Sequence, residues 1–356
     1  MESRKIAVLC NYKLLPERVG GMDHFFWQFD ATSKANNIQV DWFFPNRSLH
    51  GDYGNLNIFD SNNQNVDAFF LDFCSQNNPN YTHIVTHFVE LCTPFFKKIK
   101  QVTHAKIIAI DHNPRPINGY AFKKRLGKKV KGFLYSKYID QFIGVSQYTR
   151  NHILKDYGFF LAQKTSVIYN GIDTSIFVKR TKVNKNRFVV CSHLRESKGI
   201  QDLLQAVSVL ENEIKNQIQI DIYGEGPFEN ELVTMANHLH LNQIVFFKGS
   251  TSNLYKLLAN YSYLLQPTYM ECFSLSILES LAANVPVITT TVGGNLEIIE
   301  HNKNGFIFEP KDFLALSAIL NQLVLGNLNC DQDVSLQVQN DFNLEKMVNE
   351  HIQVLG

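Results

Sequence analysis

Two carboxylates frame the start of one expected helix. Glu271 precedes a helix expected over Ser274–Ala283, and Glu279 lies eight residues further on, inside it. Because an α-helix rises ~1.5 Å per residue, the two should stand roughly 10–12 Å apart and near the same face. Ser274 and Ser276 suit a helix N-terminus, where exposed amides and the helix dipole favour an anion such as phosphate.

Such an arrangement can bind an elongated ligand with hydroxyl groups at both ends. Each carboxylate would accept hydrogen bonds from hydroxyls, and the helix N-terminus would hold a phosphate between them. A sugar nucleotide has this shape, with ribose at one end, a hexose at the other and a diphosphate between. A pair of glutamates at this spacing also occurs by chance in helical proteins, so the pair needs support from other residues.

Two histidines stand at the ends of neighbouring expected strands. His112 follows the apolar run Lys106–Ile110, and His87 ends the expected strand His83–His87. Ligands of α/β proteins bind at the carboxyl ends of strands, so His112 is the first candidate for an active-site histidine and His87 a weaker one. The alternative is a turn histidine that caps its own loop.

Two glycine-rich turns are further candidates. Gly20 and Gly21 form either a plain tight turn or a place where backbone amides approach a phosphate or an acceptor closely. The segment Gly224–Glu229 begins like a dinucleotide-binding fingerprint, but Glu229 stands at the position of the third glycine, which argues against NAD.

The expected elements alternate in a way typical of β-α-β units and parallel sheets. The first half should contain a helix over Gly21–Lys34 and strands over Lys5–Cys10, Val40–Phe44, Ala68–Asp72, His83–His87, Lys106–Ile110, Gln141–Val145 and Ser166–Tyr169. The second half should contain strands over Phe188–Ser192, Gln217–Tyr223, Ile244–Lys248, Ser262–Gln266 and Val285–Thr290. Its helices should cover Ile200–Asn212, Pro227–His238, Asn253–Ala259, Ser274–Ala283, Asp312–Leu325 and Asn343–Val354. The polar, basic segment 174–186 indicates a linker between two α/β domains.

Composition excludes several classes of protein. The 356 residues exceed one ordinary domain, and 45% hydrophobic against 19% charged residues excludes a disordered, collagen-like or coiled-coil chain. A net charge of +1 provides no general attraction for nucleic acid. The six cysteines are scattered without metal-ligand spacing, which favours reduced thiols. With no recognisable signal peptide or membrane-length apolar run, we expect a cytoplasmic protein.

One local segment is strongly basic. Seven of the fifteen residues 123–137 are Lys or Arg and none is acidic. They can form a solvated helix face or a patch against an anionic membrane surface. The apolar residues of the segment, Leu126, Val130, Phe133 and Leu134, recur at helical spacing and can face either lipid or core. The cations of the expected patch are Lys123, Lys124, Arg125, Lys128, Lys129 and Lys131.

The segment from Glu271 to Glu300, ECFSLSILESLAANVPVITTTVGGNLEIIE, followed by Asn304-Gly305-Phe306, resembles the retaining GT-B glycosyltransferases of family 4. Their pattern runs E-x-F-(G/S)-L-(P/S)-x-x-E-A-x-A-x-G-x-P-V-I. The order of supporting motifs covers nearly the whole chain: Gly20-Gly21, GVSQYTR at 144–150, VIYNGID at 167–173, KGIQDLLQA at 198–206, YGEGP at 223–227 and FFKGS at 246–250.

The resemblance implies a GT-B fold, in which two Rossmann-like, doubly wound parallel-sheet domains face each other across a cleft. It implies an acceptor-binding domain over 1–175, a donor-binding domain over 176–340 and a C-terminal helix within 341–356 that crosses back to the first domain. Glu271 would face the donor sugar, Glu279 would bind ribose and Lys198 would neutralise the leaving diphosphate. His112 would stand near the donor sugar and acceptor. The other donor-binding residues implied are Gly20, Gly21, His193, Arg195, Gly224, Ser250, Phe273, Ser274 and Leu275.

The sequence departs from the family pattern in places. The family usually has Arg five residues before the lysine, where this chain has His193. Either Arg195 compensates or a protonated His193 donates instead, since a neutral imidazole stabilises a diphosphate less than a guanidinium does. Ser280 and Asn284 replace the usual Ala and Gly.

With these residues, the resemblance implies a retaining glycosyltransferase that uses a UDP- or GDP-sugar and no metal or other cofactor. The acceptor would be a saccharide or lipid-linked saccharide, in cell-surface polysaccharide or glycolipid synthesis. The protein would be cytoplasmic, with possible peripheral binding to the inner face of the cytoplasmic membrane. The alternatives are a non-catalytic nucleotide-sugar-binding subunit, suggested by His193, and a GT-B nucleotide-sugar epimerase.

Overall fold

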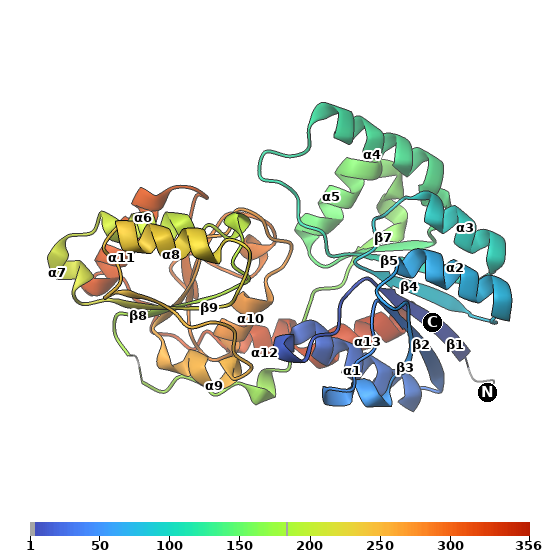
Figure 1. Cartoon of the computed structure of the whole chain (residues 1–356), viewed down its shortest axis with the longest axis horizontal. Coiled ribbons are helices and arrows are strands. Elements are labelled where there is room, and N and C mark those ends of the chain that lie inside the picture. Colours follow the sequence, from blue (N-terminus) through green and yellow to red (C-terminus); the bar gives the residue numbers. More distant parts are fainter. Residues whose placement is uncertain (1–3, 183) are drawn as a thin grey trace. The chain divides into compact units, whose positions relative to one another are not determined.

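The computed structural model describes residues 4–182 and 184–356. Its contacts divide the chain into two compact units (Figure 1). The first extends to Asn170 and includes Leu344–Gly356, and the second is Gly171–Asn343. The C-terminal helix α13 (Leu344–Val354) therefore belongs to the first unit.

The first unit is built on a seven-stranded parallel sheet in the order β3-β2-β1-β4-β5-β6-β7. Its strands are nearly continuous apolar runs, as expected for a parallel sheet covered on both faces. The strands are β1 (Arg4–Cys10), β2 (Ile38–Phe44), β3 (Asn57–Asp60), β4 (His83–His87), β5 (Lys106–Asp111), β6 (Gln141–Gly144) and β7 (Thr165–Val167). The helices are α1 (Gly21–Ala35), α2 (Val66–Asn77), α3 (Pro94–Val102), α4 (Phe122–Tyr135), α5 (Gln147–Tyr157) and α13.

The second unit repeats this architecture with six parallel strands in the order β10-β9-β8-β11-β12-β13. The strands are β8 (Arg187–Cys191), β9 (Gln219–Tyr223), β10 (Val245–Phe247), β11 (Tyr263–Gln266), β12 (Val287–Thr290) and β13 (Gly305–Phe308). The helices are α6 (Ile200–Ser208), α7 (Asn212–Lys215), α8 (Glu229–His238), α9 (Leu254–Leu257), α10 (Leu275–Ala282), α11 (Phe313–Val324) and α12 (Leu336–Asp341). Both sheets are doubly wound, which confirms the predicted fold class.

One expected strand is wrong, and two strands were not predicted. The run Ala68–Asp72 lies inside α2, because the Asn65 side chain caps that helix by accepting from the Ala68 amide at 2.9 Å. The buried residues of α2, Val66, Phe70 and Cys74, recur every four positions, a helical period that a five-residue window conceals. The unpredicted strands β3 and β13 are four residues long.

The inward face of α4 corrects the predicted basic patch. Lys128 is buried, and its ammonium lies 3.6 Å from the Asp156 carboxylate and donates to the Tyr157 hydroxyl at 3.0 Å. Arg115 joins Asp156 to Asp111, with ion pairs of 2.9 and 2.7 Å. The prediction that Lys128 faces a membrane is therefore wrong: its charge compensates a buried carboxylate instead.

Within the described ranges, none of the helices has the length and apolar character needed to cross a bilayer.

Two glycines of α4 give opposite predictions for the same substitution. A Cβ at Gly132 would lie 2.1 Å from the Tyr157 carbonyl oxygen, whereas a Cβ at Gly127 would have nothing within 4 Å. We expect Gly132→Ala to lower the free energy of unfolding by about 1–3 kcal/mol, because backbone must move to admit the methyl group. Gly127→Ala should raise it by about 0.5–1 kcal/mol through helix propensity. Urea unfolding of the two variants measures both effects, and equal effects would contradict this packing of α4.

Candidate functional site

The sheet of the second unit reverses its order between β8 and β11, and the loops that follow these strands diverge there. Such a reversal is the usual ligand position of an open α/β sheet. The loop after β8 ends in a short 3-10 helix, Glu196–Lys198, and the loop after β11 leads into α10. Lys198 and Glu271 thus stand on the two loops that the topology predicts for a site.

The side chains of Lys198 and Glu271 meet in an ion pair. The Lys198 ammonium lies 2.9 Å from Oε2 of Glu271, and Oε1 accepts from the Cys272 amide at 3.1 Å. The lysine and glutamate side chains are 23% and 17% exposed, so a ligand can reach both. An arriving anion would compete with the carboxylate for the ammonium, and the released carboxylate could accept from hydroxyl groups.

Two glycines let neighbouring loops approach the loop that carries Glu271: Gly199 on the loop after β8 and Gly293 on the loop after β12. Gly199 has a φ of +68°, and a Cβ there would lie 1.8 Å from the Pro267 carbonyl oxygen. Gly293 has a φ of +65°, and a Cβ there would lie 2.2 Å from the carbonyl oxygen of Glu271. The Tyr269 amide also donates to the Ser197 carbonyl at 2.8 Å. Backbone packing, rather than the ion pair alone, therefore fixes where the two charges stand.

The start of α10 is capped as predicted for an anion-binding helix. Ser274 is the N-cap, and its hydroxyl accepts from the Ile277 amide at 3.4 Å and from the Gln266 side chain. The first-turn amides of a helix have no acceptor inside the helix, and those of Ser274 and Leu275 are in this position. Phe273 directly precedes the cap. All three predicted amides thus lie beside Glu271 in the chain.

Glu279 lies inside α10 in an apolar setting. Burial raises the pKa of its carboxyl to about 7. Its charge contributes, after burial, to the raised pKa of the Cys191 thiol at the end of β8. Over 4–182 and 184–356, the carboxyl makes no hydrogen bond or ion pair with another side chain. A half-buried carboxylate without a partner is unfavourable, and ligand hydroxyls would relieve it.

The remaining predicted residues of the second unit lie on neighbouring loops at the same edge. His193 and Arg195 are both exposed on the loop after β8. The Gly224 amide donates to the Gly249 carbonyl at 2.9 Å. Gly224 has a φ of +134°, and its lack of a side chain lets its backbone approach the Ser192 carbonyl. The Ser250 amide donates to the Glu225 carboxylate at 3.2 Å. The loops after β8, β9 and β10 thus meet.

In the first unit, the two candidate histidines contact each other. Nδ1 of His87 and Nε2 of His112 lie 3.0 Å apart, and the His112 ring stacks on Phe88 at 4.3 Å. Burial lowers the pKa of His112 to about 3 and that of His87 well below its usual value, so both imidazoles are neutral near pH 7. The strand register places His87 opposite Ile110, two residues before His112. Sequence reasoning ranked the two histidines separately and missed this pairing.

Gly20 and Gly21 lie where the first sheet reverses, at the junction of the loop after β1 with α1. Gly20 is the N-cap of α1, and no atom lies within 4 Å of the place where its Cβ would be, so a ligand could approach the backbone. Its amide donates to the Asp23 carboxylate at 2.9 Å. The fully buried Asp23 also accepts from the hydroxyls of Tyr12 and Tyr53, at 3.0 and 2.6 Å, and so shapes this turn. Sequence analysis did not identify Asp23.

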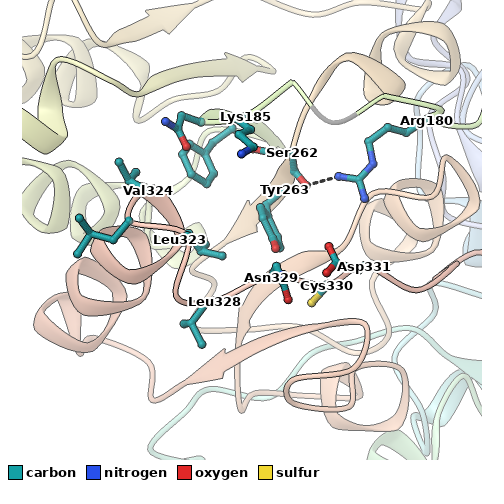
Figure 2. A pocket seen from close by; sticks show the side chains of 14 residues that line it. Arg180, Lys185, Ser262, Tyr263, Leu323, Val324, Leu328, Asn329, Cys330 and Asp331 are labelled. Carbon is teal, nitrogen blue, oxygen red and sulfur yellow. Dashed lines mark hydrogen bonds between the residues drawn. The ribbon is translucent and has the colours of Figure 1, made fainter.

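A cavity of about 350 Å³ lies elsewhere in the second unit (Figure 2). Its wall includes Phe188 and Tyr263, which stand at the amino ends of β8 and β11. Arg180, one of its charged groups, already donates to the Ser262 carbonyl at 2.8 Å. None of the predicted site residues lines this cavity, and Lys198 and Glu271 follow the opposite ends of the same strands.

In the part of the chain that the structure describes, no group of three His, Cys, Asp or Glu side chains is placed to hold a metal ion.

Two family models match the chain: Glycosyl transferases group 1 over residues 172–335 and Glycosyltransferase Family 4 over residues 67–176. The chain is 28% identical over 197 residues to N-acetyl-alpha-D-glucosaminyl L-malate synthase of Bacillus anthracis, covering 52% of this chain and 51% of that protein. It is 30% identical over 124 residues to poly(ribitol-phosphate) alpha-N-acetylglucosaminyltransferase of Staphylococcus aureus, covering 35% and 25%. The chain spans about half the length of the first curated relatives that it matches.

Solved structures share the fold over nearly the whole chain. Anabaena Alr3699/HepE in complex with UDP has a TM-score of 0.77 at 18% identity, covering 99% of both chains. Sucrose-phosphate synthase from Thermosynechococcus elongatus has a TM-score of 0.80 at 16% identity, covering 99% of this chain and 98% of that one. The likenesses to solved structures show the GT-B fold, and the two family models, which together span residues 67–335, show that the chain belongs to the family 4 glycosyltransferases.

Proposed function

We propose that this protein transfers a sugar from a nucleotide-sugar donor to a hydroxyl group of a saccharide or lipid-linked acceptor, with retention of configuration and without a metal ion. The observation that carries the proposal is the Lys198–Glu271 pair at the strand reversal, directly before the capped start of α10. A protein of the same fold was solved with UDP-glucose bound, which supports a uridine-based donor.

In the proposed reaction, the donor diphosphate lies against the Lys198 ammonium and the first-turn amides of α10. Negative charge grows on the diphosphate as the bond between the sugar C1 and the phosphate oxygen breaks, so a fixed cation stabilises the transition state more than the bound donor. The acceptor oxygen then forms its bond to C1 from the same face. The departing phosphate oxygen takes the acceptor proton, so the balance requires no further reactant.

Three further side chains position the donor in this proposal. Glu271, once its lysine is shared with the diphosphate, accepts from sugar hydroxyls, and Glu279 accepts from the ribose. His112 offers a neutral imidazole to a sugar hydroxyl, with its orientation fixed by His87. The exposed Arg195, rather than His193, supplies the second cation for the diphosphate, because a guanidinium stays charged and can donate two parallel hydrogen bonds to phosphate oxygens.

The relatives support an acceptor in a cell-surface polymer. One is named poly(ribitol-phosphate) alpha-N-acetylglucosaminyltransferase, and another, 22% identical over 227 residues, is an O-antigen biosynthesis glycosyltransferase of Escherichia coli. We therefore propose a role in the synthesis of a cell-surface polysaccharide or glycolipid.

We also propose peripheral binding to an anionic membrane surface, such as the inner face of the cytoplasmic membrane. With Lys128 buried and Lys131 in an ion pair of 2.7 Å with Glu90, the cations that face solvent on α4 are Lys123, Lys124, Arg125 and Lys129. Each cation near an anionic surface adds about 1 kcal/mol of binding free energy.

Removing either member of the ion pair should slow transfer. We expect Glu271→Ala and Lys198→Ala each to lower turnover tenfold or more, about 1.4 kcal/mol in the barrier, because donor contacts are lost. The measurement is release of nucleoside diphosphate in the presence of donor and acceptor, with far-UV circular dichroism to confirm the native fold. Lys303→Ala, which removes an exposed ion pair with Glu300 in the same unit, is the control and should keep full turnover.

The outcomes also separate the alternative functions. Full activity in both site variants would discard the site. A wild-type protein that binds donor but never transfers its sugar would support the non-catalytic subunit, and a changed sugar after incubation with donor alone would support the epimerase.

Nucleotide binding should stabilise the protein through Glu279. UDP or GDP at about 100 times its dissociation constant should add about 2.7 kcal/mol to the free energy of unfolding. In a thermal-shift assay at fixed nucleotide concentration, Glu279→Ala should reduce the shift, because the ribose loses an acceptor. Glu231→Ala, which removes an exposed carboxylate of α8, should leave the shift unchanged. Absence of any shift with either nucleotide would argue against a nucleotide-sugar donor.

Neutralising the exposed cations of α4 should weaken membrane binding. A variant with Lys123, Lys124, Arg125 and Lys129 changed to Gln should lose at least a hundredfold in affinity for vesicles of phosphatidylglycerol and phosphatidylcholine, measured by co-sedimentation. The control variant, Lys97→Gln with Lys98→Gln, removes two exposed cations of α3 and should bind as the wild type does. Unchanged binding of the four-residue variant would refute the electrostatic contribution of α4.

A further inference from the structure

Helix α4 directs its apolar face to solvent and part of its polar face inward, the reverse of an ordinary amphipathic helix that packs on a core. The residues that face inward are Lys128 and Gly132, while large apolar side chains face solvent. Phe122 and Phe133 are 76% and 77% exposed, and Leu126 is 56% exposed. Val130 and Leu134 are also exposed. The structure thus decides between the two orientations left open by the sequence: the apolar residues do not enter the core.

The exposed residues form one continuous stripe. At ~100° per residue, Phe122, Leu126, Val130, Phe133 and Leu134 occupy about a third of the helix circumference. Lys123 and Lys129 lie within or beside this stripe. The 17 residues 121–137 contain no acidic side chain.

A second segment extends the stripe. The 3-10 helix η4 (Phe159–Lys164) follows α5 and presents Phe159 and Phe160, which are 72% and 64% exposed. The Lys129 ammonium lies 5.8 Å from the centre of the Phe159 ring, so the two segments adjoin. The tight packing of Gly132 on the Tyr157 carbonyl brings the end of α5 against α4, and Figure 1 shows the two helices side by side. Sequence analysis gave no role to Phe159 and Phe160.

Buried charges hold the stripe outward. Turning α4 to bury its apolar residues would expose Lys128 and leave the Asp156 carboxylate without one of its cations. The same carboxylate pairs with Arg115, which also binds Asp111. Separating this buried pair would leave a carboxylate less well compensated, so the exposed orientation is maintained against the tendency of apolar surface to leave water.

We propose that α4 and η4 form a lipid-inserting surface: the aromatic and aliphatic side chains of Phe122, Leu126, Val130, Phe133, Leu134, Phe159 and Phe160 enter the interfacial region of a bilayer whose head groups are anionic. Exposed apolar patches mark interaction sites, and the flanking cations without acidic neighbours select a bilayer with negative charge over a protein groove. The inference rests on the proposed peripheral binding and adds to it an apolar contribution from two segments.

The surface is linked to the loop that carries His112. Lys128 of α4, Asp156 of α5 and Arg115 form an unbroken series of contacts to Asp111, which directly precedes His112. A bilayer that holds α4 therefore also fixes the height of this loop relative to the lipid head groups. A lipid-linked acceptor, whose reactive hydroxyl must extend from those head groups, would benefit from such a fixed distance.

Tryptophan substitutions test the insertion directly. Phe133→Trp and Phe160→Trp, made separately, place one probe in each segment at exposed positions where folding should not suffer. On vesicles of phosphatidylglycerol and phosphatidylcholine, both should shift their fluorescence to shorter wavelength and be quenched by brominated lipid chains. Leu314→Trp, at a 61% exposed position of α11 in the second unit, is the control and should show neither effect.

A second variant measures the strength of insertion. Phe133→Ser with Phe160→Ser should reduce partitioning to the same vesicles at least tenfold, with unchanged nucleotide binding. The idea is overturned if the wild type binds these vesicles while the probes at 133 and 160 remain unquenched, since binding would then be electrostatic only. Lack of any wild-type binding to the vesicles would overturn both insertion and peripheral binding, and would leave the proposed sugar transfer standing, because neither assay uses a donor.

Discussion

The candidate site depends on an ammonium and a carboxylate held together at the point where a parallel sheet reverses its strand order. The positions of Lys198 and Glu271 depend on close backbone packing between the loops that carry them and their neighbours. Gly199, on the loop after β8, and Gly293, on the loop after β12, adopt positive φ angles and contact the Pro267 and Glu271 carbonyl oxygens of the loop after β11. The ion pair is thus a consequence of backbone packing as much as of attraction, and its members are already in place for an anion that can replace the carboxylate.

The first unit contains a pair of neutral histidines and, separate from it, a series of buried ion pairs. The imidazoles of His87 and His112 share a hydrogen bond among aromatic rings, where burial keeps them uncharged. A buried series of charges, Lys128, Asp156, Arg115 and Asp111, instead joins α4 and α5 to the loop after β5. A rigid ionic network therefore stands directly beside a pair of neutral hydrogen-bonding rings.

Much of this architecture could be predicted from sequence, for identifiable physical reasons. Apolar runs such as Lys5–Cys10 and Lys106–Ile110 were correctly predicted as strands, because buried parallel strands need apolar residues on both faces. The strand predicted over Ala68–Asp72 was wrong because five residues do not distinguish a strand from a buried helix. The cap by Asn65 marks this segment as the start of a helix. The burial of Lys128 could not be predicted from sequence, because its partner Asp156 lies 28 residues further along the chain. The pairing of His87 with His112 required the strand register.

Two buried histidines of the first unit and one buried carboxyl of the second respond to acid in opposite directions. Burial lowers the pKa values of His112 and His351 to about 3 and 4, so the unfolded chain binds more protons than the folded one below pH ~6.5. Acidification from that point therefore destabilises the first unit. Glu279, with a pKa raised to about 7, binds its proton more tightly in the folded state, so the same acidification stabilises the second unit between about pH 7 and its unfolded value near 4.3. Between about pH 6.5 and 4.5, acid should therefore weaken the contribution of these histidines to stability while it strengthens that of Glu279.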